Sequence, residues 1–306
     1  MYKKYVIETK SAVKSYGSLL ALDHISIHVA QGSIYGLIGD NGAGKSTLLK
    51  LLTGHVFADS GEILLFGKNG EKELRNCLRQ TGTMIEQPGF FPGMTAEQML
   101  EYYRIQKGVP GKVKVEETLK LTGIWEKRKC KCKTLSLGQK QRLGLAIALI
   151  SQPRLLILDE PINGLDPSGI IEMRNLFHRL NQEKNITILL SSHILTELQQ
   201  TADTFGFLHK GQLLEELDAD KLSEKCRNYL TILVTDPQSY MALLDQYAPK
   251  DSCLVLSDHS IEITNPLREP EFYSQLAAEH RILIKSMEQR HASLEEYFIN
   301  LKGGKQ

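Results

Sequence analysis

Along the first two thirds of the chain, segments whose hydrophobic pattern is typical of a strand alternate with segments whose pattern is typical of a helix. Residues 25–29 alternate apolar and polar side chains, as a half-buried strand does, and residues 33–38 form a more continuous apolar strand. A helical pattern then begins at Lys45 and ends at Gly54, a residue type that commonly stops a helix. Residues 62–66 predict a further strand. This part of the chain therefore predicts short strands joined by turns, with one helix before the last of these strands.

The pattern becomes mostly helical between residues 95 and 150, where apolar side chains repeat on one helix face at Leu143, Ala146, Ile147 and Ile150. Two strands of the fully buried type follow, at residues 155–158 and 186–190. Between them the pattern is again helical, at residues 170–180. Such an alternation of strand, helix and strand predicts a mainly parallel sheet with crossover helices.

The last 86 residues predict a separate small unit. We place the boundary between residues 1–220 and 221–306, and a helical subdomain at about residues 88–150. The tail predicts four strands and three helices in the order of a split βαβ unit: strand 230–234, helix 237–247, strands 253–256 and 261–264, helix 270–278, strand 282–285 and helix 292–301. The fold expected is α/β with a small C-terminal α+β domain.

Composition narrows the class of protein. The chain has 306 residues, 42% hydrophobic and 24% charged, which is an ordinary globular balance. A formal net charge of +1 favours neither a nucleic-acid partner nor binding to anionic lipid. Apolar runs stay short of a spanning helix, and no signal peptide pattern follows the N-terminus. Five scattered cysteines argue against a disulfide framework. We expect a chain made and kept in the cytoplasm.

A phosphate-binding loop lies between the second predicted strand and the first helix. Its glycines let backbone N–H groups turn inward, and the helix that follows directs its N-terminus at the anion. Lys45 adds a positive charge for the terminal phosphates, and the hydroxyl of Ser46 suits Mg²⁺. The loop matches the pattern G-x-x-x-x-G-K-[ST] in full, through Gly39, Asp40, Asn41, Gly42, Ala43, Gly44, Lys45, Ser46 and Thr47.

A pair of acids, Asp159 and Glu160, ends the buried strand 155–158. Ligands bind at the carboxyl ends of parallel strands, so both carboxylates are placed for chemistry. Adjacent residues of a strand point to opposite faces, and the two acids therefore take different roles. In ATPases with such a loop, an acid in the place of Asp159 holds Mg²⁺, and Glu160 would orient or deprotonate the attacking water.

Five further elements stand in one order along the chain, and together they resemble the ABC ATPase family, from about Tyr5 to Leu217. Residues 135–139, Leu-Ser-Leu-Gly-Gln, resemble the family signature, and residues 163–167 resemble its D-loop. Single residues that match the family are Tyr16, in the place of the adenine-stacking aromatic, Gln87, in the place of the Q-loop glutamine, and His193, in the place of the switch histidine.

This resemblance implies a P-loop NTPase fold of the ABC ATPase type, with an antiparallel β subdomain and a helical subdomain beside the sheet. It implies ATP and Mg²⁺ as cofactors, with Gln87 as a further magnesium ligand and catalytic group and His193 on the γ-phosphate. Ser136 is a good N-cap for the helix that follows, and its helix end would address the nucleotide of a second copy. The signature and the D-loop would then complete that nucleotide site through Ser136, Gly138, Gln139 and Asp166.

One position departs from the usual signature, since Leu137 stands in place of a glycine. The chain is similar to the bacitracin- and lantibiotic-type exporter ATPases, in which a Leu-Ser-Leu-Gly signature and a C-terminal extension also occur. The expected function is the ATPase of a membrane exporter of antimicrobial peptide or another amphiphile, at the cytoplasmic face of the membrane. Its expected partners are a second copy and a polytopic permease on another chain, without nucleic acid. The alternative is a soluble ABC ATPase that remodels a complex such as the ribosome.

Overall fold

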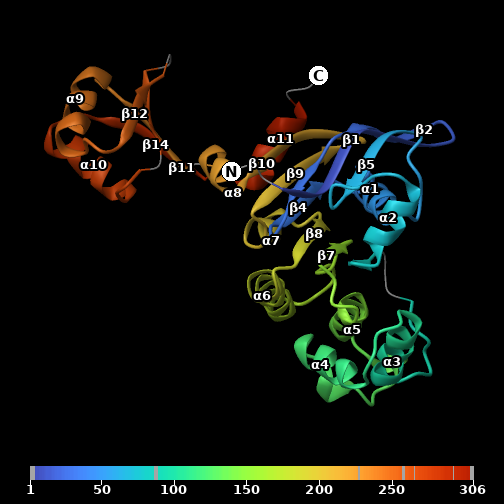
Figure 1. Ribbon diagram of the computed structural model, residues 1–306. Helices are drawn as coiled ribbons and strands as arrows, with labels where there is room; N and C mark the ends of the chain where they lie inside the picture. The colour runs from blue at the N-terminus through green and yellow to red at the C-terminus, as the bar shows by residue number, and fades with distance from the viewer. Residues whose placement is uncertain are drawn as a thin grey trace. The chain divides into compact units, whose positions relative to one another are not determined.

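The computed structural model of the protein describes residues 4–85, 89–226, 228–256, 259–264, 266–291 and 293–303. The chain divides into two compact units, residues 1–219 and 220–306 (Figure 1). We call them the nucleotide unit and the C-terminal unit. Among the helices of the described residues, none combines the length and the apolar character needed to cross a lipid bilayer.

A six-stranded sheet forms the centre of the nucleotide unit, in the order β10-β9-β4-β8-β7-β6. The pairs β9–β4, β4–β8, β8–β7 and β7–β6 are parallel, while β10 and β9 pair as an antiparallel hairpin. Every residue of β4, β7 and β8 is buried, which explains the continuous apolar runs in the sequence. The strands are β4 Ile34–Gly39, β6 Thr81–Met84, β7 Leu155–Leu158, β8 Thr187–Ser192, β9 Thr204–His209 and β10 Gln212–Asp218.

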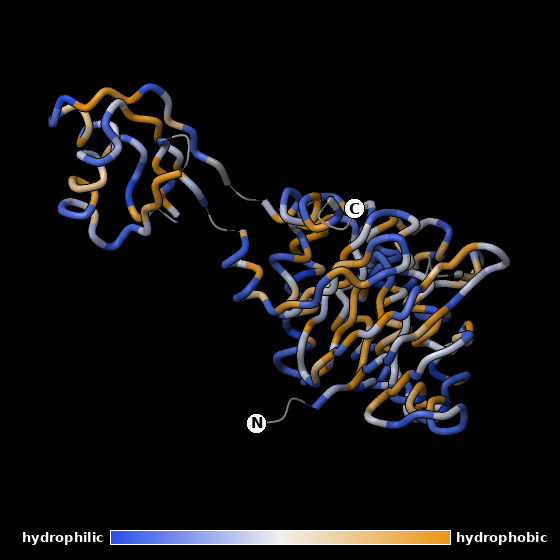
Figure 2. The backbone as a smooth tube through the Cα atoms, turned by 90° about the horizontal axis from the view of Figure 1, so that it is seen from above, coloured by the Kyte–Doolittle hydropathy of each residue, from blue (hydrophilic) through white to orange (hydrophobic). Residues whose placement is uncertain are grey.

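Helices α1 Lys45–Leu52, α2 Glu71–Leu78, α6 Pro167–Lys184 and α7 Leu195–Gln199 connect these strands. Orange segments, which mark hydrophobic residues, concentrate in the strands of this unit (Figure 2). Leu48, Leu49 and Leu52 of α1 pack into the core that also holds residues of β4 and β7. The predicted parallel sheet with crossover helices is confirmed.

An antiparallel layer precedes the loop, formed by β1 Tyr5–Tyr16, β2 Leu19–Ile25, β3 His28–Ala30 and β5 Ser60–Leu65. The prediction of one strand over residues 25–29 is wrong in its continuity, although the alternation of buried Ile25, Ile27 and Val29 is correct. The strand is interrupted because the two halves pair with different parts of β1: Ile25 lies opposite Ala12, and Val29 lies opposite Ile7. Between them Ile27 donates its N–H to the Thr9 hydroxyl.

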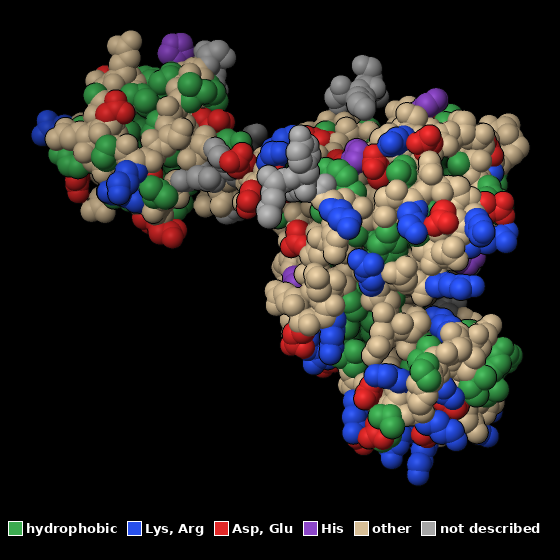
Figure 3. Space-filling view, viewed as in Figure 1, with side chains coloured by type: hydrophobic (Ala, Val, Ile, Leu, Met, Phe, Trp, Pro, Cys, Tyr) green, Lys and Arg blue, Asp and Glu red, His purple; other side chains and the backbone are tan. Residues whose placement is uncertain are grey.

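The predicted helical region contains α3 Ala96–Gln106, α4 Val113–Leu121 and α5 Leu137–Leu149, with short 3-10 turns at Trp125–Lys127 and Cys132–Thr134. Leu143, Ala146 and Ile150 are buried together in its own core, and Ile147 packs against them, as the periodicity predicts. Between residues 89 and 150 the sequence holds twelve lysines and arginines against five glutamates, so the near-neutral charge of the chain is an average over uneven parts. Lys and Arg side chains accordingly gather over α3 and α4 (Figure 3).

The C-terminal unit contains a four-stranded antiparallel sheet in the order β12-β13-β11-β14. Two helices pack on it through Tyr240, Leu244 and Tyr273, against a core that includes Leu230 and Ile263. The elements are α8 Ala219–Lys225, β11 Asn228–Val234, α9 Pro237–Tyr247, β12 Ser252–Val255, β13 Ser260–Thr264, α10 Pro270–Glu279, β14 Ile284–His291 and α11 Leu294–Gly303. The predicted α+β fold of split βαβ type is confirmed.

Candidate nucleotide site

A cleft of about 650 Å³ opens at the carboxyl ends of β4 and β7. This is the edge of a parallel sheet at which ligands bind. Its walls come from the phosphate-binding loop, from the hairpin that joins β1 to β2, from the turn between β9 and β10, and from residues after β7 and β8. The residues that line it are Tyr16, Leu19, Leu20, Ala21, Asp40, Asn41, Gly42, Gly44, Lys45, Ser46, Thr47, Glu160, Asn163, His193, Lys210 and Gly211.

The phosphate-binding loop joins β4 to α1 and ends at Gly44, whose φ of 109° is one that side chains rarely adopt. A Cβ on Gly44 would also lie 2.7 Å from the carbonyl oxygen of Ala21, so only glycine fits. Helix α1 begins at Lys45, with no side chain capping its N-terminus and no acid in its first turn. The N–H groups of this first turn are therefore suited to bind an anion.

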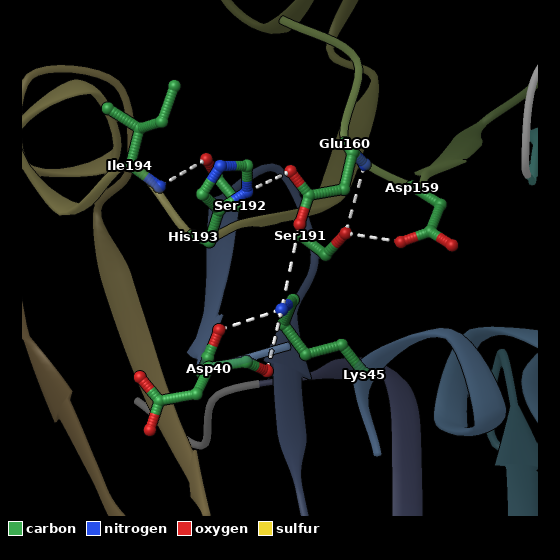
Figure 4. Close-up of polar contacts among 9 residues, drawn as sticks. Asp40, Lys45, Asp159, Glu160, Ser191, Ser192, His193 and Ile194 are labelled. Carbon is green, nitrogen blue, oxygen red and sulfur yellow. Dashed lines mark hydrogen bonds and ion pairs between the residues drawn. The ribbon is translucent and has the colours of Figure 1, made fainter. Parts of the chain in front are cut away.

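Lys45 is held inside the loop, with its side chain 5% exposed. Its ammonium donates to the carbonyl oxygens of Gly39, at 2.7 Å, and Asp40, at 3.2 Å. It also lies 3.6 Å from Oε1 of Glu160 (Figure 4). The cation is thus fixed between the loop backbone and the carboxylate that follows β7.

Asp159 and Glu160 are joined by a serine of the neighbouring strand. The Ser191 hydroxyl, at the end of β8, donates to Oδ1 of Asp159 at 2.6 Å and accepts the N–H of Glu160 at 3.0 Å (Figure 4). Asp159 is buried, whereas Glu160 lines the cleft. The φ of Glu160 is 48°, a strained value for this residue type that turns its side chain out of the strand direction. The two acids do face different surroundings.

His193 lies next to Glu160, and both side chains line the cleft. Its Nδ1 is 2.7 Å from Oε2 of Glu160, and its side chain is 38% exposed. Because Oε1 of the same carboxylate faces Lys45, Glu160 lies between two nitrogen groups. Three residues from separate motifs, Lys45, Glu160 and His193, therefore meet at one point, as Figure 4 shows.

The far end of the cleft is partly apolar. Tyr16 is 45% exposed there, beside the exposed Leu19 and Leu20. An exposed ring next to aliphatic side chains is suited to stack on a planar base. Sequence reasoning missed several residues that line the cleft, namely Leu19, Leu20, Ala21, Lys210 and Gly211; Asn163 stood within the D-loop pattern but was not expected to line the cleft. Lys210 and Gly211 form the β9–β10 turn, and a Lys-Gly pair between two strands was the available signal.

The predicted signature residues do not line this cleft. Ser136 caps α5: its hydroxyl accepts the N–H of Gln139 at 3.3 Å, and its own N–H donates to Oε1 of Gln139 at 3.2 Å. Asp166, at the start of α6, accepts a hydrogen bond of 2.7 Å from the Ser168 hydroxyl, which lowers the pKa of Asp166. Among the described site residues, those outside the cleft are Gly39, Ala43, Ser136, Gly138, Gln139, Asp159 and Asp166. Gln87 lies outside the described residues.

Oxygen donors suitable for magnesium are present near the loop. Ser46 lines the cleft with a hydroxyl, and Asp159 offers a carboxylate. Magnesium prefers such hard oxygens and takes its remaining ligands from phosphates and water. The part of the chain that the structure describes has no cluster of three or more His, Cys, Asp or Glu that could hold a metal. One hydroxyl and one carboxylate fit a magnesium ion that takes its other ligands from a nucleotide and from water.

Comparison with known proteins decides the family. A family model described as ABC transporter matches residues 22–163. The bacitracin transport ATP-binding protein BcrA of Bacillus licheniformis is 41% identical, over 98% of this chain and 98% of its own length. This chain belongs to the ABC transporter ATP-binding family. The lantibiotic transport ATP-binding protein SrtF of Streptococcus pyogenes is 40% identical over 70% of this chain and 92% of its own.

Solved structures agree on the fold. A dimeric ATP-binding cassette, MJ0796, in a post-hydrolysis state with ADP and phosphate bound, has a TM-score of 0.64 and 24% identity, over 70% of this chain and 98% of its own. The ADP conformation of the cassette MJ1267 also gives a TM-score of 0.64, at 26% identity, over 71% of this chain and 92% of its own. The ABC ATPase fold is thereby confirmed, and the chain is an ATP-binding, ATP-hydrolysing subunit.

Proposed function

We propose that this subunit powers the export of an antimicrobial peptide or similar amphiphile, as a peripheral protein on the cytoplasmic face of the membrane. Two copies would work with a polytopic permease carried on another chain. The support for the cargo is the function for which the relatives are named, bacitracin transport and lantibiotic transport. The observation that carries the ATPase part is the meeting of Lys45, Glu160 and His193 in one cleft.

Each wall of the cleft suits one part of ATP. The Tyr16 ring would stack on the adenine, and the N–H groups of the loop with the first turn of α1 would bind the phosphates. Lys45 is already fixed among carbonyl oxygens, so a phosphate oxygen can join these partners without a large side-chain movement. Ser46 and Asp159 would hold Mg²⁺, which when bound offsets the charge of the terminal phosphates.

Glu160 is the group best placed to act on water. Its carboxylate lines the cleft and can accept a proton, while His193 holds Oε2 at 2.7 Å. Ser191 fixes the backbone of Glu160 in its positive-φ conformation. His193 thus orients the carboxylate and would contact the γ-phosphate. Positioning and charge stabilisation supply most of the catalysis in phosphoryl transfer.

The helix start at Ser136 supports a site shared by two copies. Ser136, Gly138 and Gln139 lie outside the cleft of their own chain, although the first turn of α5 carries the partial positive charge of a helix N-terminus. In a head-to-tail pair this turn would close over the nucleotide of the second copy. Each copy would then supply one cleft and one signature helix.

Two measurements test the proposal. Glu160→Gln protein, with ATP and magnesium, should elute from size exclusion as a dimer, since the nucleotide stays unhydrolysed between two copies. A strictly monomeric variant would refute the shared site. For the cargo, cells that express the subunit with its permease should gain bacitracin resistance, and the Glu160→Gln version should lose it. Equal sensitivity to both bacitracin and a lantibiotic, with active and inactive subunit, would refute the cargo.

A further inference from the structure

Leu137, the departure from the family signature, lies against the D-loop of its own chain. A Cβ placed on Gly164 would lie 2.6 Å from Cδ2 of Leu137, so the end of the leucine side chain would have to move to admit it. Leu137 therefore occupies the space beside Gly164 that any other residue would need for its side chain. Its exposed fraction is 39%, so the rest of the side chain remains accessible.

The contact is reciprocal. A Cβ on Gly138 would lie 3.4 Å from Cδ2 of Leu165, in ordinary van der Waals contact. A leucine of the signature turn thus lies over a glycine of the D-loop, and a leucine of the D-loop lies over a glycine of the signature turn. We call these two contacts the leucine–glycine pair. They join the first turn of α5 to the loop between β7 and α6.

Each side of the leucine–glycine pair leads to a different nucleotide. On one side Asn163 lines the cleft of its own chain and donates its N–H to the carbonyl oxygen of Glu160 at 3.2 Å. On the other side Ser136 caps α5 outside that cleft. A shift of Glu160 or Asn163 on binding ATP would therefore reach Ser136 through packed atoms, because close-packed groups move together.

We propose that Leu137 is a positioning residue that fixes the signature turn to the D-loop of the same chain. Occupancy of one cleft would then set the position of the signature serine over the second cleft. This inference rests on the two-copy site proposed above. With a glycine at this position the contact at Gly164 would be lost, and the coupling between the clefts would be weaker.

Removal of the Leu137 side chain tests this role. Leu137→Gly should lower the Hill coefficient of ATP hydrolysis toward one and reduce kcat about fivefold or more, the usual size of a coupling between sites. The ATP affinity of Leu137→Gly should be measured at protein concentrations too low for dimers to form. It should stay within about twofold of the wild-type affinity, a difference too small to indicate a lost contact with the nucleotide. Leu137→Met should restore both parameters, and Ile171→Ala, an exposed aliphatic side chain on α6, serves as the matched control.

A double-mutant cycle separates coupling from a loss of stability. Gly164→Ala places a methyl group against Leu137 and should reduce kcat strongly in the wild-type background. The same substitution should cost less in Leu137→Gly, because the space is then open. The φ of Gly164, 73°, strains alanine equally in both backgrounds, so this strain cancels in the cycle.

The outcomes distinguish this inference from the proposed function. If Glu160→Gln dimerises with ATP but Leu137→Gly keeps the wild-type Hill coefficient and kcat, the coupling role is wrong and the shared site stands. Additive effects of Leu137→Gly and Gly164→Ala would likewise overturn it. If Glu160→Gln stays monomeric, both are overturned, because Ser136 then has no second cleft to reach.

Discussion

The two units of the chain use buried polar groups in opposite ways. In the nucleotide unit, Lys45 and Asp159 are buried next to the cleft, and their partners belong to the loop or to the end of a neighbouring strand. In the C-terminal unit, the hydroxyl of Tyr240 donates to the backbone carbonyl of Tyr273 at 2.6 Å, and Tyr273 in turn hydrogen-bonds Asp251. The first arrangement places charged groups beside the cleft, and the second joins a helix pair.

Two residues at the edge of the cleft have a positive φ. Glu160 has a positive φ at the carboxyl end of β7, and the loop before α1 needs Gly44 at a φ of 109°. Such conformations persist only where surrounding contacts hold them, and they are typical of functional sites. The polar contacts of Tyr240 and Tyr273 instead connect α9 and α10 within the hydrophobic core of the C-terminal unit. We therefore expect chemistry in one unit and structural stability in the other.

The strongest test of this contrast is the loss of the carboxylate at Glu160. Glu160→Gln keeps the size of the side chain but removes the proton acceptor, so ATP hydrolysis should fall at least about 100-fold. ATP binding should be retained, because the loop and Lys45 are unchanged. The rate of phosphate release measures ATP hydrolysis, and calorimetry measures ATP binding. Glu183→Gln, an exposed glutamate on α6, is the matched control and should hydrolyse ATP normally. Near-normal turnover in Glu160→Gln would remove Glu160 from the proposed role.

The next largest effect should follow the loss of the Lys45 ammonium. Lys45→Ala removes a charged hydrogen-bond donor from the phosphate end of the cleft, and ATP affinity should fall about tenfold or more. Calorimetry gives the dissociation constant directly. Lys72→Ala, on the exposed face of α2, removes a similar charge that does not line the cleft, and this variant should bind ATP like the wild type. If Lys45→Ala has a normal circular dichroism spectrum and unchanged affinity for ATP, then Lys45 does not bind the phosphates of ATP.

The sequence predicts the parts of the site that are contiguous along the chain. The loop from Gly39 to Thr47 is visible because one turn must supply the glycines, the lysine and the hydroxyl together. Ser191 was not predicted as a link between the two acids, since that contact spans more than thirty residues and depends on β8 lying beside β7. The position of Leu137 on Gly164 likewise depends on how α5 meets the D-loop, which no local pattern contains.

The fold shows the same limit. Strand β6, Thr81–Met84, was missed because its sequence is not an apolar run. Gly82 is required there, since a Cβ would lie 2.4 Å from the carbonyl oxygen of Ala148 at the end of α5. In the C-terminal unit the periodic pattern places helix α9 at its observed bounds, Pro237–Tyr247, whereas the strand predicted over residues 282–285 is observed as β14, Ile284–His291. Regular elements follow from periodicity, whereas close contacts between elements do not.

A smaller effect, confined to the C-terminal unit, should follow from Tyr240→Phe. The change removes the hydroxyl that donates to the carbonyl oxygen of Tyr273, and the net loss of one such hydrogen bond costs about 0.5–1.5 kcal/mol of the local unfolding free energy. Hydrogen exchange of the β11 and β13 amides in the whole chain measures this loss. Tyr247→Phe, at an exposed tyrosine of the same helix, should leave the exchange rates unchanged. A fall in ATP hydrolysis with Tyr240→Phe would contradict the expectation that this hydrogen bond serves only the stability of the C-terminal unit.

The smallest effect concerns the half-buried thiol of Cys253 in the C-terminal unit. Burial raises the pKa of Cys253 to about 11, from an ordinary value of 9.0. The native state therefore keeps a proton that the unfolded chain loses, and its contribution to stability is present below pH 9 and lost as the pH rises toward 11. Since the thiolate is the reactive species, alkylation of Cys253 by iodoacetamide at pH 9 should be about fifty times slower in the native protein than in urea. Peptide mapping by mass spectrometry measures both rates. Equal rates at pH 9 would mean that the thiol ionises as freely as an exposed one, and that this unit, like the nucleotide cleft, presents a charged group to solvent.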